Sequence, residues 1–325
     1  MPSRGAVGFV ANPASGKDIR RVTARASVFD NQEKTAMVRR CLIGLRAMSD
    51  APIRYLADAN RLVESALAEL GFDAEAVDVE TRGKAADTTH AAEAMRGAGA
   101  VVTLGGDGTN RAFAKGWLDA PLIPLSTGTN NAFPVMREAT TAGAAAGLLV
   151  SRRIPLEAVA ERAKVIHVDI EGEPPDLALI DAVLTHDRFV GARALDDPAK
   201  LIAAMLTRAD PASVGMTSVG GFAHPLSERE DAALVLTFDG TSPRRVVAAL
   251  APGRFESIGL GQTRTAVLGE PMQLTGPGVL AFDGERERVL APGQAATLRT
   301  LRDGPWVVDV RRVLARAVAC DSRQR

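Results

Sequence analysis

The chain has 325 residues, of which 46% are hydrophobic, so it can bury a substantial core and its length suggests two domains. Lysine plus arginine and aspartate plus glutamate both number 39, so the formal net charge is zero. A neutral chain has no overall field to hold nucleic acid or an anionic membrane, so we expect neither partner, and any phosphate site must be local.

The cysteines and the N-terminus indicate a compartment. Cys41 and Cys320 are far apart, with no second cysteine or clustered histidine to complete a metal site. We therefore expect no structural disulfide, no metal site made by side chains alone, and a cytoplasmic location. The apolar stretch after Arg4 ends at Asn12 and is too short for a signal or a membrane-spanning segment.

The first third of the chain alternates between strand-like and helix-like segments. Asp30 and Glu33 form a plausible capping box for a helix with Cys41 on its buried face, and Asp58 is placed to cap a second helix that Gly71 ends. The expected strands are Ala6–Ala11, Pro52–Ala57 and Ala74–Glu80, and a further helix covers Thr88–Arg96. Such alternation predicts a parallel sheet with helices on both faces.

The stretch from Val101 to Asn110 reads V-V-T-L-G-G-D-G-T-N and is the most informative part of the sequence. A buried strand ends in a glycine turn, and Arg111–Trp117 follows as a short helix. Glycines and free helix amides make an anion site, but Asp107 would repel a phosphate unless it binds a metal or takes a proton. The alternative is a tight turn that Asp107 caps.

Two more polar loops follow predicted strands. Asn12–Lys17 comes after the first strand, and Ser126–Asn131 comes after Pro121–Leu125. Loops at the carboxyl ends of parallel strands form ligand sites, and the uncharged groups of Ser126–Asn131 suit a ribose or an adenine edge. On local grounds alone, each loop also reads as an ordinary turn.

The sequence pattern changes after the helix predicted for Glu138–Val150. Short β-like runs separated by turns predict a sandwich or barrel, and Asp197-Pro198 is expected to start a helix that runs through Leu206. Asp283-Gly284-Glu285 offers two carboxylates, although Asp-Gly between β-like runs is a strong turn signal by itself. The expected strands are Ala163–Ile170, Leu177–Thr185, Ala232–Phe238, Arg244–Leu250, Thr265–Leu268, Val279–Phe282 and Ala295–Leu301.

Five motifs in order carry a family resemblance. The Gly105–Thr109 string resembles the signature shared by NAD kinases, diacylglycerol kinases and sphingosine-type lipid kinases. The other four are Asn12–Lys17, Pro121–Pro124, Ser126–Asn131 and Asp283–Glu285. Together they span nearly the whole chain, which looks most like the ATP-NAD kinase family, in the branch that includes acetoin-catabolism protein X.

The resemblance implies a fold and an activity. It implies an α/β nucleotide-binding domain over residues 1–155 and a β-rich, sandwich-like substrate domain over residues 156–325, with the tail of about residues 305–325 returning to the first domain. The activity would be transfer of the γ-phosphoryl of ATP to a hydroxyl of a small molecule, with NAD the favoured acceptor and Mg²⁺ carried by ATP. Related proteins often self-associate, so a homo-oligomer is expected.

The resemblance also implies site residues. Asp107 is the first candidate for the catalytic base and Glu285 the second. The expected nucleotide contacts are Asn12, Ser15, Gly105, Gly106, Gly108, Thr109, Asn110, Gly128, Thr129, Asn130, Asn131 and Asp283.

Some features leave other functions open. Thr217–Gly221 resembles only loosely the segment with which NAD kinases hold the dinucleotide, and as a bare sequence it is a glycine turn. The Asn-Glu pair that grips the ribose in NAD kinases has no match here, since Asp181 fits it poorly. A lipid kinase and a nucleotide-binding regulator without turnover are therefore the alternatives.

Overall fold

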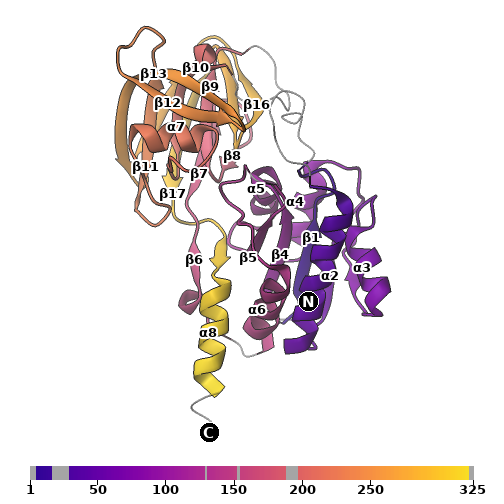
Figure 1. The fold of residues 1–325 in the computed structure, drawn as a ribbon. Coiled ribbons are helices and arrows are strands. Elements are labelled where there is room, and N and C mark those ends of the chain that lie inside the picture. The colour runs from indigo at the N-terminus through magenta and orange to yellow at the C-terminus, as the bar shows by residue number, and fades with distance from the viewer. Residues whose placement is uncertain (1–4, 17–28, 129, 152–153, 188–196, 322–325) are drawn as a thin grey trace.

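A computed structural model describes residues 5–16, 29–128, 130–151, 154–187 and 197–321, and shows two domains in contact (Figure 1). The first is an α/β domain built on a sheet of mostly parallel strands, and the second is an antiparallel β sandwich. The fold class predicted from the sequence is confirmed.

The first sheet has the strand order β3-β2-β1-β4-β5-β18-β6, and its pairs are parallel except for β18 with β6. β3 keeps only two residues of the strand predicted over Ala74–Glu80. The strands are β1 Val7–Ala11, β2 Ile53–Tyr55, β3 Glu75–Ala76, β4 Ala100–Gly105, β5 Pro121–Ser126, β6 Ala160–Arg162 and β18 Trp306–Val308.

Helices cover both faces of this sheet because alternate strand residues point to opposite sides. On β4, Val102 packs into the core under α2, α3, α6 and α8, whereas Val101 packs under α4 and α5. α2 and α6 approach so closely that a Cβ on Gly143 would lie 1.9 Å from the carbonyl oxygen of Cys41. The helices are α2 Asn31–Met48, α3 Leu62–Leu70, α4 Ala85–Ala94, α5 Asp107–Gly116, α6 Ala139–Ser151 and α8 Val310–Asp321.

Local signals place several helix ends. The Asp30 carboxylate accepts a hydrogen bond from Glu33 N at 2.8 Å, which caps α2 as predicted. Gly71 ends α3 in the left-handed region with φ 65°. The Asp58 carboxylate accepts a hydrogen bond from Leu62 N, the first residue of α3, at 3.0 Å. Asp58 therefore caps this helix from a position four residues before it.

The second domain packs two antiparallel sheets around a common core. Their orders are β12-β13-β11-β10-β9-β15-β16 and β14-β17-β7-β8. Ile166 and Leu298 from the smaller sheet meet Met205 and Phe282 from the larger one in this core. The strands are β7 Val165–Ile170, β8 Asp176–Ala178, β9 Asp181–Thr185, β10 Leu201–Leu206, β11 Ala232–Phe238, β12 Arg245–Ala251, β13 Arg254–Val267, β14 Pro271–Thr275, β15 Gly278–Phe282, β16 Glu285–Leu290 and β17 Ala295–Leu301.

The helix predicted from Asp197-Pro198 through Leu206 is wrong. Only the short 3-10 turn η2, Pro198–Lys200, forms before β10 begins. β10 is buried on both faces, with Met205 in the sandwich core and Leu206 under helix α7, Met216–Ala223. A continuous apolar run in the sequence is compatible with a buried strand and with a buried helix, so the pattern does not distinguish them.

Two other segments differ from their bare sequence patterns. Thr217–Gly221, which reads as a glycine turn, lies inside α7 and packs over the outer face of the larger sheet. The run predicted over Leu177–Thr185 is split, because Leu179 and Ile180 separate β8 from β9.

Two segments that connect the domains lie next to each other. β6 leads out of the first sheet, and β18 returns beside it to pair with both β5 and β6. α8 then packs against the first domain, with Val310 and Val313 in the same core as α2 and α6. Among the described residues, no helix combines the length and apolar character needed to cross a membrane.

Candidate functional site

The loops after β1, β4 and β5 meet at the carboxyl edge of the first sheet, where open α/β sheets bind ligands. Asn12 Nδ2 donates to Thr109 Oγ1 at 2.8 Å, which joins the first loop to helix α5. The hydroxyls of Ser15 and Thr127 lie 2.7 Å apart and join the first loop to the third. The structure therefore brings together three polar loops that are separate in the sequence.

A buried lysine supports the first of these loops. Lys34 has no exposed surface, and its ammonium donates to the carbonyl oxygens of Asn12, Pro13 and Ser15 at 3.1, 2.9 and 2.6 Å. Sequence reasoning missed this residue. The available signal was its spacing, because Lys34 shares the apolar face of α2 with Cys41, and lysine is almost never fully buried unless it is paired.

Asp107 is the first residue of α5, and its carboxylate anchors the loop that follows β5. It accepts from Ala132 N at 3.1 Å to each oxygen and from Phe133 N at 2.8 Å. Asn110 is fully buried and donates from Nδ2 to Gly106 O at 2.9 Å, so its side chain holds the glycine turn. The structure gives Asp107 and Asn110 roles in holding these loops together.

The loop after β5 offers partly exposed polar groups. Asn131 Nδ2 donates to Ser126 Oγ at 2.8 Å, and a Cβ on Gly106 would lie 2.8 Å from Asn131 Oδ1. Glycine at position 106 therefore lets the two loops approach this closely without displacing the Asn131 side chain. Gly128 and Asn130 are also partly exposed, whereas Thr129 lies outside the described residues.

Asp283 and Gly284 form the two-residue turn that joins β15 to β16, and Glu285 is the first residue of β16. Positive φ values of 50° and 84° at Asp283 and Gly284 fit the hairpin turn that Asp-Gly favours. The Asp283 carboxylate accepts from the backbone N–H groups of Leu179, Ile180 and Asp181 at 2.7 to 3.2 Å. Burial raises the pKa of Asp283 to about 6, although the charge of Arg111 opposes the shift.

The same turn brings a carboxylate of the second domain to the first. Glu285 is exposed, and a Cβ on Gly108 would lie 3.4 Å from Glu285 Oε1. Glu285 therefore faces the first turn of α5, where the helix dipole and free N–H groups favour negative charge.

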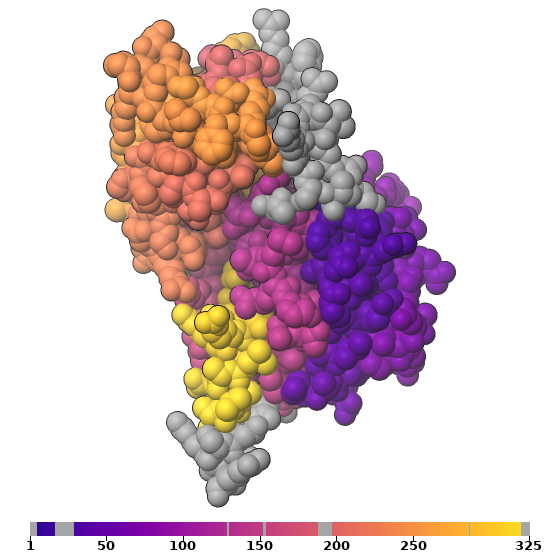
Figure 2. All heavy atoms as spheres, in the orientation of Figure 1, coloured from indigo at the N-terminus to yellow at the C-terminus, as the bar shows by residue number. Residues whose placement is uncertain are grey.

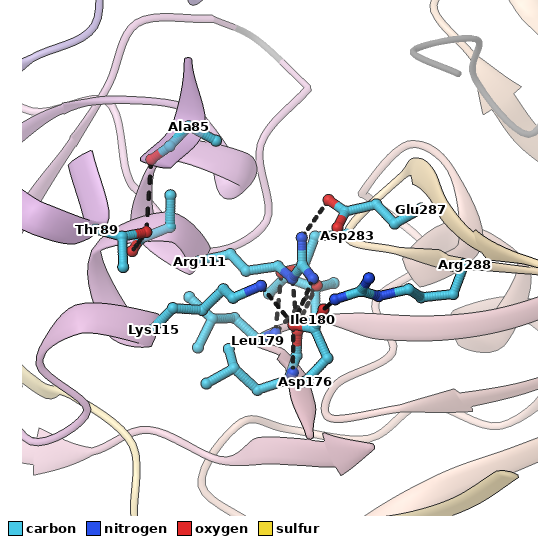
Figure 3. A network of polar contacts seen from close by, with 12 residues as sticks. Ala85, Thr89, Arg111, Lys115, Asp176, Leu179, Ile180, Asp283, Glu287 and Arg288 are labelled. Atoms are coloured by element: carbon cyan, nitrogen blue, oxygen red, sulfur yellow. Dashed lines mark hydrogen bonds and ion pairs between the residues drawn. The ribbon is translucent and has the colours of Figure 1, made fainter. Parts of the chain in front are cut away.

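Beyond this contact, an ionic cluster joins the domains (Figure 3). The Asp176 side chain has no exposed surface and is contacted by Arg111 at 2.8 Å, Lys115 at 2.9 Å and Arg288 at 2.9 Å. Burial would raise the pKa of Asp176, but Arg111 and Lys115 outweigh burial and lower it. Arg111 also donates to Glu287 and to the carbonyl oxygen of Leu177.

One cation of the second domain reaches the loop that Asp107 anchors. Arg208 Nη1 donates to Ala132 O at 2.9 Å, and its guanidinium lies 6.0 Å from the centre of the Phe133 ring. Burial lowers the pKa of Arg208, while Glu228 and Asp107 oppose that shift. Sequence reasoning missed Arg208 and Asp176, since nothing local marks a residue that acts across a domain boundary.

Together these groups form a site suited to a phosphate-bearing ligand. Glycine loops and a helix N-terminus bind anions, hydroxyls and amides add neutral hydrogen bonds, and Arg208 supplies a nearby positive charge. No group of three or more His, Cys, Asp or Glu side chains that could hold a metal occurs among the described residues. A Mg²⁺ ion that binds with a nucleotide takes most of its ligands from phosphate oxygens and water, so it needs no such group of side chains.

Each of the two domains matches a known family model. A family model described as the ATP-NAD kinase N-terminal domain matches residues 7–154, and one described as the acetoin catabolism protein X C-terminal domain matches residues 164–303. Acetoin catabolism protein X from Cupriavidus necator is 35% identical over 315 residues, which cover 91% of this chain and 88% of that protein. The chain therefore belongs to the acetoin catabolism protein X branch of the ATP-NAD kinase family.

Two solved structures resemble the chain more distantly. Yeast NADH kinase complexed with NADH shares 13% identity at a TM-score of 0.46, covering 94% of this chain and 83% of that one. An NAD kinase from Archaeoglobus fulgidus in complex with ATP shares 12% identity at a TM-score of 0.46, covering 97% of each chain.

Proposed function

We propose that the chain is a phosphotransferase that moves the γ-phosphoryl group of ATP to a hydroxyl of a small molecule, with NAD as acceptor and NADP as product. The observation that carries the proposal is the meeting of two parts at the N-terminus of α5: the Gly105–Thr109 turn of the first domain and Glu285 of the second. Family membership supports the reaction class, because the first domain matches the ATP-NAD kinase model.

The first domain would hold the nucleotide. Free N–H groups of α5 and its glycine turn would face the phosphates, with Asn12 and Ser15 beside them. Gly128, Asn130 and Asn131 would meet the ribose or base, because their partly exposed polar groups lie in the adjoining loop. A helix N-terminus stabilises an anion by only about 0.3–1 kcal/mol, so a triphosphate needs these further contacts.

Two carboxylates are available for proton transfer. Backbone donors already occupy both oxygens of Asp107, which favours an anchoring or metal-binding role there. Glu285 is exposed at the helix N-terminus, and this position favours it as the base, so the order expected from the resemblance is reversed in our proposal. Assistance by a general base contributes roughly 10²–10⁴ in rate.

The acceptor hydroxyl gives its proton to the Glu285 carboxylate while its oxygen bonds to the γ-phosphorus. The bond from that phosphorus to the β,γ-bridging oxygen breaks, and ADP leaves with the electron pair. Mg²⁺, when bound, would neutralise the charge that develops on the phosphate oxygens. A cytoplasmic setting and a homo-oligomer stay expectations beside this proposal.

The test uses the full-length protein with ATP, Mg²⁺ and NAD, and separates NADP and ADP by chromatography. The proposal predicts NADP and ADP in equal amounts, and neither product above background when NAD is left out. ADP without NADP would remove NAD as acceptor and direct the work to other hydroxyl compounds, lipids included. Binding of ATP without any turnover would contradict the enzyme and support the regulator.

A further inference from the structure

One face of α5 connects the candidate site to the ionic cluster. Gly108, Arg111 and Lys115 are three and four residues apart, so they share one face of the helix. Along this face, Gly108 meets Glu285, and the next turn brings Arg111 to Glu287. α5 and β16 therefore meet at two points, which are one turn apart on the helix and two residues apart on the strand.

β16 is irregular at Glu287, the residue that contacts Arg111. Leu280 pairs with Arg288 and Ala281 pairs with Arg286, so Glu287 is the extra residue of a β-bulge. Successive residues of a regular strand point to opposite faces, and a bulge re-aims them. Here Glu287 and Arg288 both reach the cluster, because Arg288 Nη2 lies 2.9 Å from Asp176 while Glu287 contacts Arg111.

Asp176 gives the cluster a fixed centre. Its fully buried carboxylate holds Arg111 and Lys115 of α5 as well as Arg288 of β16, so a single residue of β8 ties helix to hairpin. The Arg111 guanidinium also lies 4.9 Å from the centre of the Phe282 ring, directly before the turn. Arg111 of α5 thus contacts β8, β15 and β16.

We propose that Arg111 is a positioning residue for Glu285: by holding the bulge of β16, its guanidinium keeps the Glu285 carboxylate at the first turn of α5. The planar fork of arginine serves Asp176, Glu287 and the Leu177 carbonyl together, and a lysine ammonium lacks that geometry. The catalytic part of this inference rests on the proposed function, because it assigns Glu285 to the reacting hydroxyl.

Hydrogen exchange tests the structural part without any assumption about activity. In the full-length protein, Arg111→Lys should speed amide exchange over residues 285–288 by about tenfold or more, as local opening becomes easier. Exchange over β12 and β13 should not change. Arg245→Lys is the matched control, because Arg245 lies on β12 and donates only within its own hairpin and turn. Unchanged exchange at 285–288, or a uniform rise along the whole chain, would overturn the proposal.

A double-mutant cycle tests the catalytic part. If Arg111 acts through Glu285, Arg111→Lys lowers kcat for NADP formation by about tenfold or more, within the roughly 10²–10⁴ that a base contributes, and leaves the KM for ATP unchanged. The same change in a Glu285→Gln background has no further effect. Additive effects on kcat would refute positioning through Glu285. A wild type without phosphoryl transfer would contradict the proposed function instead, and hydrogen exchange would still decide whether Arg111 holds the hairpin.

Discussion

The role of Asp107 separates anchoring from base catalysis. In Asp107→Asn, Oδ1 still accepts from Phe133 N at 2.8 Å and from Ala132 N at 3.1 Å, but the amide nitrogen replaces an oxygen 3.1 Å from Ala132 N and accepts nothing. Hydrogen bonds to charged groups contribute about 1.5–3 kcal/mol, roughly twice the neutral value. We therefore expect the free energy of unfolding to fall by about 1–2 kcal/mol.

Two assays read this change. Urea denaturation gives the free energy of unfolding, with Asp119→Asn as control because Asp119 is an exposed carboxylate just past the other end of α5. Kinetics of NADP formation should show a higher KM for ATP, because the loop after β5 is less firmly held, and a loss of kcat smaller than that of Glu285→Gln. Unchanged stability together with a loss of kcat of about 100-fold or more would contradict the anchoring role and make Asp107 the base.

Two further variants test the framework around the site. Lys34→Met keeps the side-chain volume but leaves the carbonyl oxygens of Asn12, Pro13 and Ser15 without their donor, so the free energy of unfolding in urea should fall by about 2–4 kcal/mol. Lys200 is half-exposed, so the control Lys200→Met should change this free energy hardly at all. Equal losses in the two variants would contradict this role of Lys34. The pKa of Asp283 is raised to about 6, so folding takes up a proton at this carboxylate. As the pH rises from 4 to 7, the free energy of unfolding of the wild type should fall by up to about 3 kcal/mol relative to that of Asp283→Asn. Urea midpoints of the two proteins that stay parallel across this range would contradict the raised pKa.

The sequence predicted the features that depend on neighbouring residues. Asp30 caps α2, Gly71 ends α3, and Asp283-Gly284 forms a hairpin turn, because each signal acts within a few residues of chain. The alternation of strands and helices in the first domain likewise predicted a parallel sheet. The five polar motifs identified the family, and the match to acetoin catabolism protein X confirms it.

Long-range contacts explain what the sequence did not predict. The sequence predicts a helix at β10 because burial on both faces of this strand removes the alternation of polar and apolar residues. Arg111 stands where a dinucleotide-binding motif would have its third glycine. The two carboxylates that it contacts, Asp176 and Glu287, lie 65 and 176 residues away along the chain. The role of Lys34 depends on a loop about 20 residues earlier, which only the folded chain brings to its ammonium.

The candidate site residues also differ in whether the sequence alone could bring them together. Those in the glycine turn and in the loops after β1 and β5 come together as expected, because strands of one parallel sheet end at a common edge. The approach of Glu285 to Gly108 depends on how the second domain packs against the first. No local sequence pattern predicts that packing. Whether these residues bind ATP and NAD stays a prediction.

We propose that phosphoryl transfer takes place between the first turn of α5 and Glu285. The decisive experiment follows the γ-phosphoryl group of labelled ATP into NADP, with wild type and Glu285→Gln compared under the same saturating conditions. We predict labelled NADP from the wild type and a kcat lower by roughly 10²–10⁴ in the variant, with ATP binding retained. Equal rates of label transfer in the two proteins would contradict it.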